Sequence, residues 1–184
     1  ASVGSRVLTG HYIPALIMDA LSKVAPQRVL AGAGSPIWCV NISGTNEKGI
    51  PITGLFFFNG GMGASAQADG LSCVSWPSNI SSTSAEEIEN RLPVRILKRA
   101  LRKNSGGLGK HNGGDGQIVE LEYTGVTDGV LAFLADRIKT PAKGLSGGGD
   151  GAKGILKING QVIDPKMQHI IPPGSMITLA TPGG

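Results

Sequence analysis

Four carboxylates in this 184-residue sequence stand where they could do chemistry. Asp69 and Asp115 lie in or beside glycine-rich turns, where backbone N–H groups can fix a carboxylate. Glu86 and Glu89 are three residues apart, so on a helix they would share a face, and paired carboxylates can serve acid–base catalysis. A turn aspartate and a solvated helix face explain the same residues without catalysis. All four carboxylates are candidate catalytic residues.

Two glycine-rich segments accompany these carboxylates, "GGMGASAQADG" at 60–70 and "NSGGLGKHNGGDG" at 104–116. A phosphate-binding loop needs a Ser or Thr after its Gly-Lys pair and a helix on its far side. Here Gly109 and Lys110 are followed by His111, and a strand pattern follows the segment. Both segments therefore predict positive-φ turns and close packing of backbones rather than phosphate binding. The glycines expected to shape the backbone are Gly60, Gly61, Gly63, Gly113 and Gly114.

The histidines and cysteines do not form a metal-binding pattern. His11, His111 and His169 are far apart in the sequence and lack the spacing of two ligands on one helix. Cys39 and Cys73 are too few for a disulfide framework or a zinc motif, which favours a reducing cytoplasm. No Gly-x-Ser-x-Gly elbow is present, although nucleophilic catalysis by one of the many serines stays open. We expect no metal to be bound by this segment.

Composition and charge argue against several classes of partner. Aromatic residues make up only 4% of the chain, so few side chains could stack on bases, and nucleic acid is not expected. No apolar run is long enough to cross a membrane. The net charge of the chain is +4. The densest run of cationic side chains, at 95–103, predicts a strand face that is either solvated or paired with acidic residues of a neighbouring subunit. An anion site is the alternative for this run.

Two segments predict helices. Residues 13–24 repeat apolar side chains at helical spacing, with one proline in the first turn and another just beyond the end. Residues 79–91 hold Ser84 and Glu87 at capping-box spacing, and Pro93 closes this helix. The apolar stripe of the first helix consists of Leu16, Ile17, Ala20, Leu21 and Val24.

The remaining segments favour β-structure. Residues 36–42 and 50–58 predict an antiparallel hairpin, and residues 71–76 predict another short strand. Residues 93–103 continue as a strand or an irregular extended segment. Residues 117–125 alternate apolar and acidic side chains as a half-buried strand does.

Two dipeptides predict tight turns between strands. Asp128-Gly129 predicts a hairpin turn after the alternating strand, and Asn159-Gly160 predicts a type I′ turn between two short strands. The expected fold is α+β, mainly β, with antiparallel hairpins, glycine-rich turns and two helices. A glycine loop near residue 144 suggests a joint, with a helix plus a β-rich core at 1–143 and a small β segment at 144–184.

The order of several motifs resembles the hydantoinase B/oxoprolinase family. The segment at 60–70 looks like the family's Gly-Gly-x-Gly-Ala-x4-Asp-Gly stretch, and "EEIENRLPVRI" at 86–96 is similar to its Glu-x-x-Glu-x-x-x-Pro-x-Arg stretch. The segment at 104–116 is similar to its Asp-Ser-Gly-Gly-x-Gly-x-x-Arg-Gly-Gly-x-Gly stretch. The first and last stretches of the chain fit the same family, so the resemblance covers nearly the whole sequence.

The resemblance implies a segment from the later half of a hydantoinase B-type (N-methylhydantoinase B-type) subunit in a multisubunit enzyme. Such enzymes open hydantoin or 5-oxoproline rings with ATP, in the cytoplasm, together with a hydantoinase A-type subunit or domain. ATP and a divalent metal are then expected elsewhere in the full enzyme, and this segment alone is expected to be inactive. The alternatives are a subunit of an acetone or acetophenone carboxylase-like enzyme and a non-catalytic assembly domain. The partners expected are the A-type component, the rest of the same chain and further copies in an oligomer.

One departure from the family pattern is a paired loss of charge. The family's Asp and Arg in the long glycine stretch are replaced here by Asn104 and Asn112. If the family pairs these two charges across the loop, this chain would keep a neutral contact between the two asparagine side chains.

Overall fold

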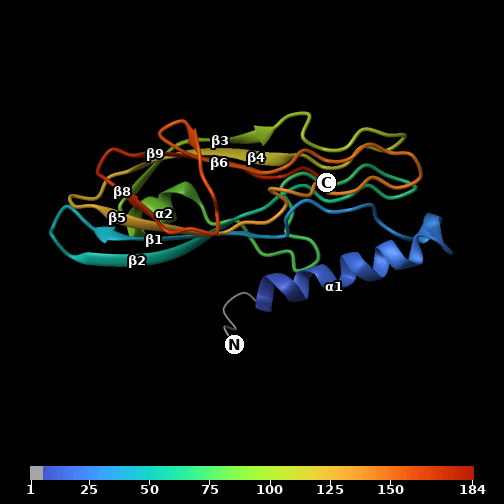
Figure 1. The fold of residues 1–184 in the computed structure, drawn as a ribbon, viewed down its shortest axis with the longest axis horizontal. Coiled ribbons are helices and arrows are strands. Elements are labelled where there is room, and N and C mark those ends of the chain that lie inside the picture. The colour runs from blue at the N-terminus through green and yellow to red at the C-terminus, as the bar shows by residue number, and fades with distance from the viewer. Residues whose placement is uncertain (1–5) are drawn as a thin grey trace.

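The computed structural model describes residues 6–184 and folds them mainly into β-structure (Figure 1). The helices are α1 (Arg6–Leu21), the short 3-10 helix η1 (Pro26–Arg28) and α2 (Ala85–Arg91). The strands are β1 (Trp38–Thr45), β2 (Pro51–Phe58), β3 (Val94–Arg102), β4 (Gly116–Tyr123), β5 (Gly129–Leu134), β6 (Ile155–Ile158), β7 (Gln161–Val162), β8 (His169–Ile171) and β9 (Met176–Ala180). The predicted α+β, mainly β, class is confirmed.

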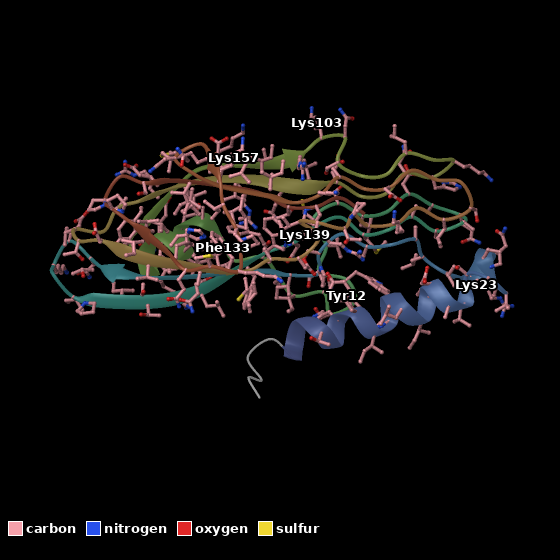
Figure 2. The ribbon with its side chains drawn as sticks, in the orientation of Figure 1. Tyr12, Lys23, Lys103, Phe133, Lys139 and Lys157 are labelled. Atoms are coloured by element: carbon pink, nitrogen blue, oxygen red, sulfur yellow. The ribbon has the colours of Figure 1, made fainter. Side chains whose placement is uncertain are left out.

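The strands form two antiparallel sheets that share one hydrophobic core. One sheet has the order β2-β1-β5-β8 and the other β3-β4-β9-β6-β7. Alternating residues of both sheets point inward, because successive side chains of a strand face opposite sides. Figure 2 shows side chains, Phe133 among them, filling the space between the layers. The largest fully buried side chains are Trp38, Tyr123, Phe58, Ile42, Leu121 and Leu131.

Strands from the last forty residues complete both sheets. β9 pairs with β4 on one side and β6 on the other, while β8 extends the first sheet beside β5. Strands from both sides of the boundary expected near residue 144 are thus hydrogen-bonded to each other in each of the two sheets.

Several local predictions are confirmed. β1 and β2 form the expected hairpin, from Thr45 opposite Pro51 to Trp38 opposite Phe58. Helix α2 is capped at Ser84, whose hydroxyl accepts the N–H of Glu87 at 3.2 Å. The β6–β7 turn has positive φ at both central residues, as a type I′ turn requires.

Helix α1 begins seven residues earlier than predicted. It starts at Arg6 rather than residue 13, and Pro14 lies inside it rather than in its first turn. The proline signal therefore marked the wrong boundary. The predicted apolar stripe does lie on α1, but it faces away from the core.

The predicted hairpin at Asp128-Gly129 is wrong. β4 and β5 belong to different sheets, so the residues between them cross from one layer to the other. The buried ring of Tyr123 explains this path: its hydroxyl donates to the carbonyl of Thr127 at 3.0 Å. A Cβ at Gly125 would overlap the same ring, so the chain can wrap tightly around it. A turn-forming dipeptide thus serves a crossover instead of a hairpin.

The predicted strand at residues 71–76 is also wrong. Cys73 has a φ of 55°, which interrupts an extended strand. Its N–H donates to the carbonyl of Asp115 at 2.9 Å, and the N–H of Val74 donates to the carbonyl of Gly60 at 3.0 Å. The segment therefore bonds to the glycine-rich segments rather than to a strand of either sheet.

Beyond the sheets, glycine-rich segments distant in sequence lie side by side as extended chains (Figure 1). We call residues 30–35, 59–74, 104–116, 142–152 and 181–184 the glycine bundle. Backbone hydrogen bonds join its members: the N–H of Gly61 donates to Pro182, that of Gly114 to Met62 and that of Gly184 to Gly114, at 2.8–3.0 Å. The bundle is thus held by main chain against main chain.

The glycines of the 60–70 and 104–116 segments are required for close approach and not for positive φ. In the described residues, positive φ at glycine occurs at Gly49, Gly147, Gly160 and Gly174. None of these lies in 60–70 or 104–116, so the positive-φ turns predicted at the glycines of these segments are absent; in 104–116 a positive φ occurs instead at Asn104, with a φ of 63°. The predicted close packing is present: a Cβ at Gly61 would overlap the carbonyl oxygen of Gly114. Any side chain at such a position would push the backbones apart.

Candidate functional site

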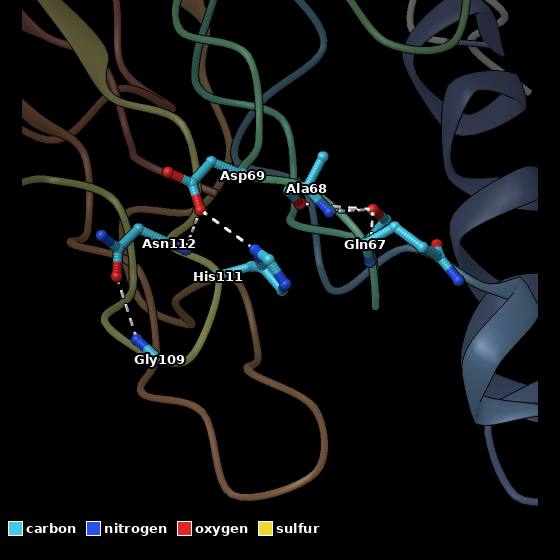
Figure 3. Close-up of polar contacts among 7 residues, drawn as sticks. Gln67, Ala68, Asp69, Gly109, His111 and Asn112 are labelled. Carbon is cyan, nitrogen blue, oxygen red and sulfur yellow. Dashed lines mark hydrogen bonds and ion pairs between the residues drawn. The ribbon is translucent and has the colours of Figure 1, made fainter.

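Asp69 fixes a contact between two segments of the glycine bundle. Its Oδ1 accepts the N–H of Asn112 at 2.8 Å, and Nδ1 of His111 lies 3.6 Å from the same oxygen (Figure 3). The side chain of Asp69 is 64% exposed and that of His111 is 26% exposed. A carboxylate beside an imidazole can orient the ring, and imidazole is the most frequent general acid or base in enzymes. The pair is therefore suited to proton transfer.

A groove of about 320 Å³ lies at the same end of the glycine bundle. His111 and its neighbour Lys110 line the groove, and so does Lys143 from another segment of the bundle. Nζ of Lys143 is 2.8 Å from Oδ2 of Asp150, which holds this lysine in a surface ion pair. The remaining lining is mostly glycine, alanine and backbone from residues 26–31, 64–66, 107–113 and 143–149. The groove thus combines an imidazole and two ammonium groups with open backbone.

Sequence reasoning missed His111 as a functional candidate. In the sequence, His111 suggests only a possible metal ligand together with His11 and His169. It lies 42 positions from Asp69, so the sequence does not indicate that the two are in contact. The glycine bundle brings the two together by setting the segments side by side. A histidine inside a glycine-rich stretch, near a lysine, was the available signal.

Asp115 is used by the scaffold. Its Oδ1 accepts the N–H groups of Ser105 and Gly106 at 2.8 and 2.9 Å, and the hydroxyl of Ser105 lies 3.3 Å away. Its own N–H donates to the hydroxyl of Ser72 at 2.9 Å. These bonds tie the two ends of the 104–116 segment to each other and to its neighbour. The geometry matches the structural alternative for this residue.

Glu86 and Glu89 lie on α2, beside the sheets (Figure 1), and no residue of α2 lines the groove. Oε1 of Glu89 accepts the N–H of Ile96 at 2.6 Å, which attaches α2 to β3. The backbone N–H of Glu86 and the hydroxyl of Ser84 lower the pKa of the Glu86 carboxyl. The structure therefore does not bring the four carboxylates into one site.

The expected contact between Asn104 and Asn112 is not a hydrogen bond in the described part of the chain. Oδ1 of Asn112 instead accepts the N–H of Gly109 at 3.1 Å. Asn104 has a φ of 63° in the turn after β3, a conformation that asparagine tolerates. Each asparagine thus serves its own turn.

The cation run on β3 faces acids of its own chain. Arg95 and Lys98 each lie 3.7 Å from a carboxylate of β4, Glu122 and Glu120 respectively. Arg99 donates to the carbonyl of Thr83 at 2.7 Å. The acids expected from a neighbouring subunit are therefore supplied by the adjacent strand, and no anion site is needed to explain the run.

A second cavity, of about 570 Å³, lies between α1 and the segment that follows β5. It is lined by Tyr12, Asp136 and Arg137, and the guanidinium of Arg137 stacks over the Tyr12 ring at 5.4 Å. Both carboxylate oxygens of Asp136 are buried without a hydrogen-bond partner in the described structure. Burial raises the pKa of Asp136 to about 7, and the positive charge of Arg137 opposes that rise. Sequence reasoning gave no signal for this site.

Replacing Asp136 by Asn should stabilise the protein at pH 8 and remove a pH dependence. The carboxyl ionises with the ordinary aspartate pKa of 3.8 when unfolded but with a pKa of about 7 when folded. The folded state therefore holds the proton longer, and wild-type stability should fall as pH rises from 4 to 7. At pH 8 the free energy of unfolding of the variant should exceed that of the wild type by on the order of 3 kcal/mol. Urea unfolding of both proteins at pH 4 and at pH 8 measures this difference. Asp128→Asn, at an exposed turn, is the control; equal stability of wild type and Asp136→Asn at pH 8 would refute the effect.

Two further properties concern membranes and metals. No helix in residues 6–184 is both long and apolar enough to cross a bilayer. The same residues contain no group of three or more His, Cys, Asp or Glu side chains placed to hold a metal ion. The groove therefore offers no donor set for a divalent cation from these residues alone.

Comparison with known proteins gives one family over the whole chain. The model of the family described as "Hydantoinase B/oxoprolinase" matches residues 1–184. "5-oxoprolinase 1" of Arabidopsis thaliana is 30% identical over 192 residues, covering 100% of this chain and 14% of the relative. The B-type subunit of a putative D-/L-hydantoinase of Pseudomonas sp. (strain NS671) is 30% identical over 155 residues, covering 84% of this chain and 26% of the relative.

Two solved structures share the fold. A nucleotide-free acetone carboxylase has a TM-score of 0.74 at 19% identity, over 89% of this chain and 27% of that one. An ATP-dependent caprolactamase from Pseudomonas jessenii has a TM-score of 0.66 at 20% identity, over 90% of this chain and 31% of that one. The chain spans 14% to 26% of the two curated relatives, so it corresponds to one part of much longer proteins. From the match over its full length, the chain belongs to the hydantoinase B/oxoprolinase family.

Proposed function

We propose that this chain is a glycine-built part of an ATP-dependent cyclic amide hydrolase, of the type that opens hydantoin or 5-oxoproline rings. The observation that carries the proposal is the family match over residues 1–184. The names of its relatives, a 5-oxoprolinase and a hydantoinase component, point to five-membered cyclic amides. The shared fold of an ATP-dependent caprolactamase supports the same class.

The chemistry explains why ATP is needed. An amide carbonyl is a poor electrophile because the nitrogen lone pair is delocalised into it. Transfer of the γ-phosphoryl group of ATP to the carbonyl oxygen, with ADP as the leaving group, makes the carbon attackable by water. The C–N bond of the tetrahedral intermediate then breaks as the ring nitrogen receives a proton, and a second water hydrolyses the remaining acyl phosphate to a carboxylate and inorganic phosphate. Neither a phosphate-binding loop nor a metal-ligand cluster occurs in the described residues, so we assign ATP and a divalent metal to other parts of the full enzyme, with a hydantoinase A-type partner.

Within this chain we assign proton transfer to His111, with Asp69 as its positioning residue. The carboxylate lies 3.6 Å from Nδ1, which leaves Nε2 as the ring nitrogen for exchange. Lys110 adds positive charge along the groove, which favours an anionic substrate or intermediate, whereas the charge of Lys143 is offset by its ion pair with Asp150. Glu86, Glu89 and Asp115 act as structural residues in this proposal, because each serves a local contact described above.

His111→Gln in the full-length enzyme, assembled with its A-type partner, should lower kcat about 100-fold while the complex still forms. Asp69→Asn keeps an oxygen for the N–H of Asn112, so it should preserve the loop while lowering kcat, because the imidazole of His111 loses its charged neighbour. Rates of ring-opened product and of ADP release are the measurements, with Asp128→Asn as the surface control. Wild-type turnover in the His111 variant would show that the groove takes no part in catalysis and would favour a non-catalytic assembly domain.

A carboxylase subunit is the second candidate function. The acetone carboxylase shares the fold with a TM-score of 0.74, compared with 0.66 for the caprolactamase. Dependence of turnover on bicarbonate, with acetone or acetophenone as substrate, separates this candidate from ring hydrolysis.

A further inference from the structure

Helix α1 carries its apolar stripe on the surface. Its exposed side chains are 67% accessible at Leu16 and 52% at Ile17, and 79% at Val24 just beyond the helix. In Figure 1, α1 lies along the outside of the molecule, beside the glycine bundle. A contiguous apolar stripe of this kind on a protein surface marks an interaction site. The full stripe is Ile13, Leu16, Ile17, Ala20, Leu21 and Val24.

The opposite side of α1 faces the rest of the molecule. His11, Tyr12, Ala15, Met18 and Ser22 are partly buried, and their spacing of three and four residues places them on one side of a helix. Tyr12 lies on the side of α1 that faces the rest of the molecule (Figure 2) and packs against Arg137, and Nε2 of His11 lies 2.7 Å from the hydroxyl of Ser78. The contacts that attach α1 to the rest of the molecule therefore leave its apolar stripe exposed to solvent.

The spacing of the stripe indicates a helical partner. On α1, Ile13, Ile17 and Ala20 are separated by four and three residues, the spacing with which two helices pack along a common seam. A small residue, Ala20, within the seam permits close approach of the two axes.

The area argues against a second copy of this chain as the occupant. A stripe on a helix of 16 residues buries on the order of 500 Å² per copy, less than the ~800 Å² per partner of stable interfaces. The curated relatives, in contrast, are several times longer than this chain. A helix from that additional polypeptide would bury the stripe as one part of a larger contact.

We propose that the apolar stripe of α1 docks against an amphipathic helix in the remainder of the hydantoinase B-type polypeptide. The docked pair forms a seam in which Ile13, Ile17 and Val24 interleave with apolar side chains of the partner helix. This contact holds the glycine bundle in a fixed orientation to the rest of the enzyme. The proposal rests on family membership and on α1, and it is independent of the reaction catalysed.

Thiol labelling of the full-length hydantoinase B-type protein tests the proposal. Leu16→Cys is compared with Val162→Cys, whose side chain on β7 is equally accessible here at 71%. Cys73 is replaced by Ser in both variants so that it does not react. Leu16→Cys should react with a maleimide at least about tenfold more slowly than Val162→Cys in the native protein, and at the same rate in urea.

Three outcomes would overturn the proposal. Equal labelling of the two native variants means that the stripe is open. Protection that disappears on dilution means that a second copy covers it. Protection that appears only after the A-type subunit is added means that the partner subunit covers it.

Discussion

Gly61→Ala should destabilise the protein by more than about 3 kcal/mol, the largest effect expected for a single methyl group in this chain. The added Cβ would overlap the carbonyl oxygen of Gly114, which belongs to a neighbouring backbone and cannot rotate away. Relief would require separating segments whose N–H and carbonyl groups bond to each other, such as Gly114 to Met62 at 2.8 Å. The midpoint of urea unfolding measures the loss.

Gly10→Ala is the matched control for that substitution. Nothing lies within 4 Å of a Cβ at Gly10, which sits inside α1. Alanine is favoured over glycine in a helix, so this variant should gain roughly 0.5–1 kcal/mol. Similar stabilities for the two variants would show that close backbone contact does not hold the glycine bundle together.

Asp115→Ala should cost about 3 kcal/mol or more, and Asp115→Asn much less. Alanine leaves the N–H groups of Ser105 and Gly106 without their acceptor, and unpaired polar groups are costly when buried. Asparagine retains an oxygen in the position of Oδ1, so it loses charge but keeps an acceptor. Unfolding midpoints and turnover of the assembled enzyme are measured together. An Asn variant that folds with wild-type stability yet has no turnover would instead make Asp115 catalytic.

The sequence predicted elements that depend on neighbouring residues. The Ser84 cap, the β1–β2 hairpin and the Asn159-Gly160 turn all follow from chemistry within a few positions, and all are present. The hairpin expected at Asp128-Gly129 is absent because β5 pairs with the distant strand β1 in the other sheet, and the chain reaches it by wrapping around the nearby Tyr123 ring. Local turn propensity cannot distinguish a hairpin from a crossover between sheets.

The glycine motifs correctly predicted close packing of backbones, but they did not predict that the packed segments would be extended chains. Their spacing gave the expectation of tight turns, whereas the structure uses Gly61 and Gly113 to let extended backbones touch. That requirement comes from segments far apart in the sequence. For the same reason the contact between Asp69 and His111 could not be predicted, since only the glycine bundle brings them together.

The most direct test of the proposed function is turnover by the full-length enzyme assembled with its hydantoinase A-type partner. Hydantoin and 5-oxoproline are supplied with ATP and a divalent cation, with bicarbonate removed, and ring-opened product and ADP are followed together. We predict ring opening that requires ATP and releases ADP in step with product. Absence of amide turnover, with ATP consumed only when a ketone and bicarbonate are both present, would contradict the proposal and identify a carboxylase.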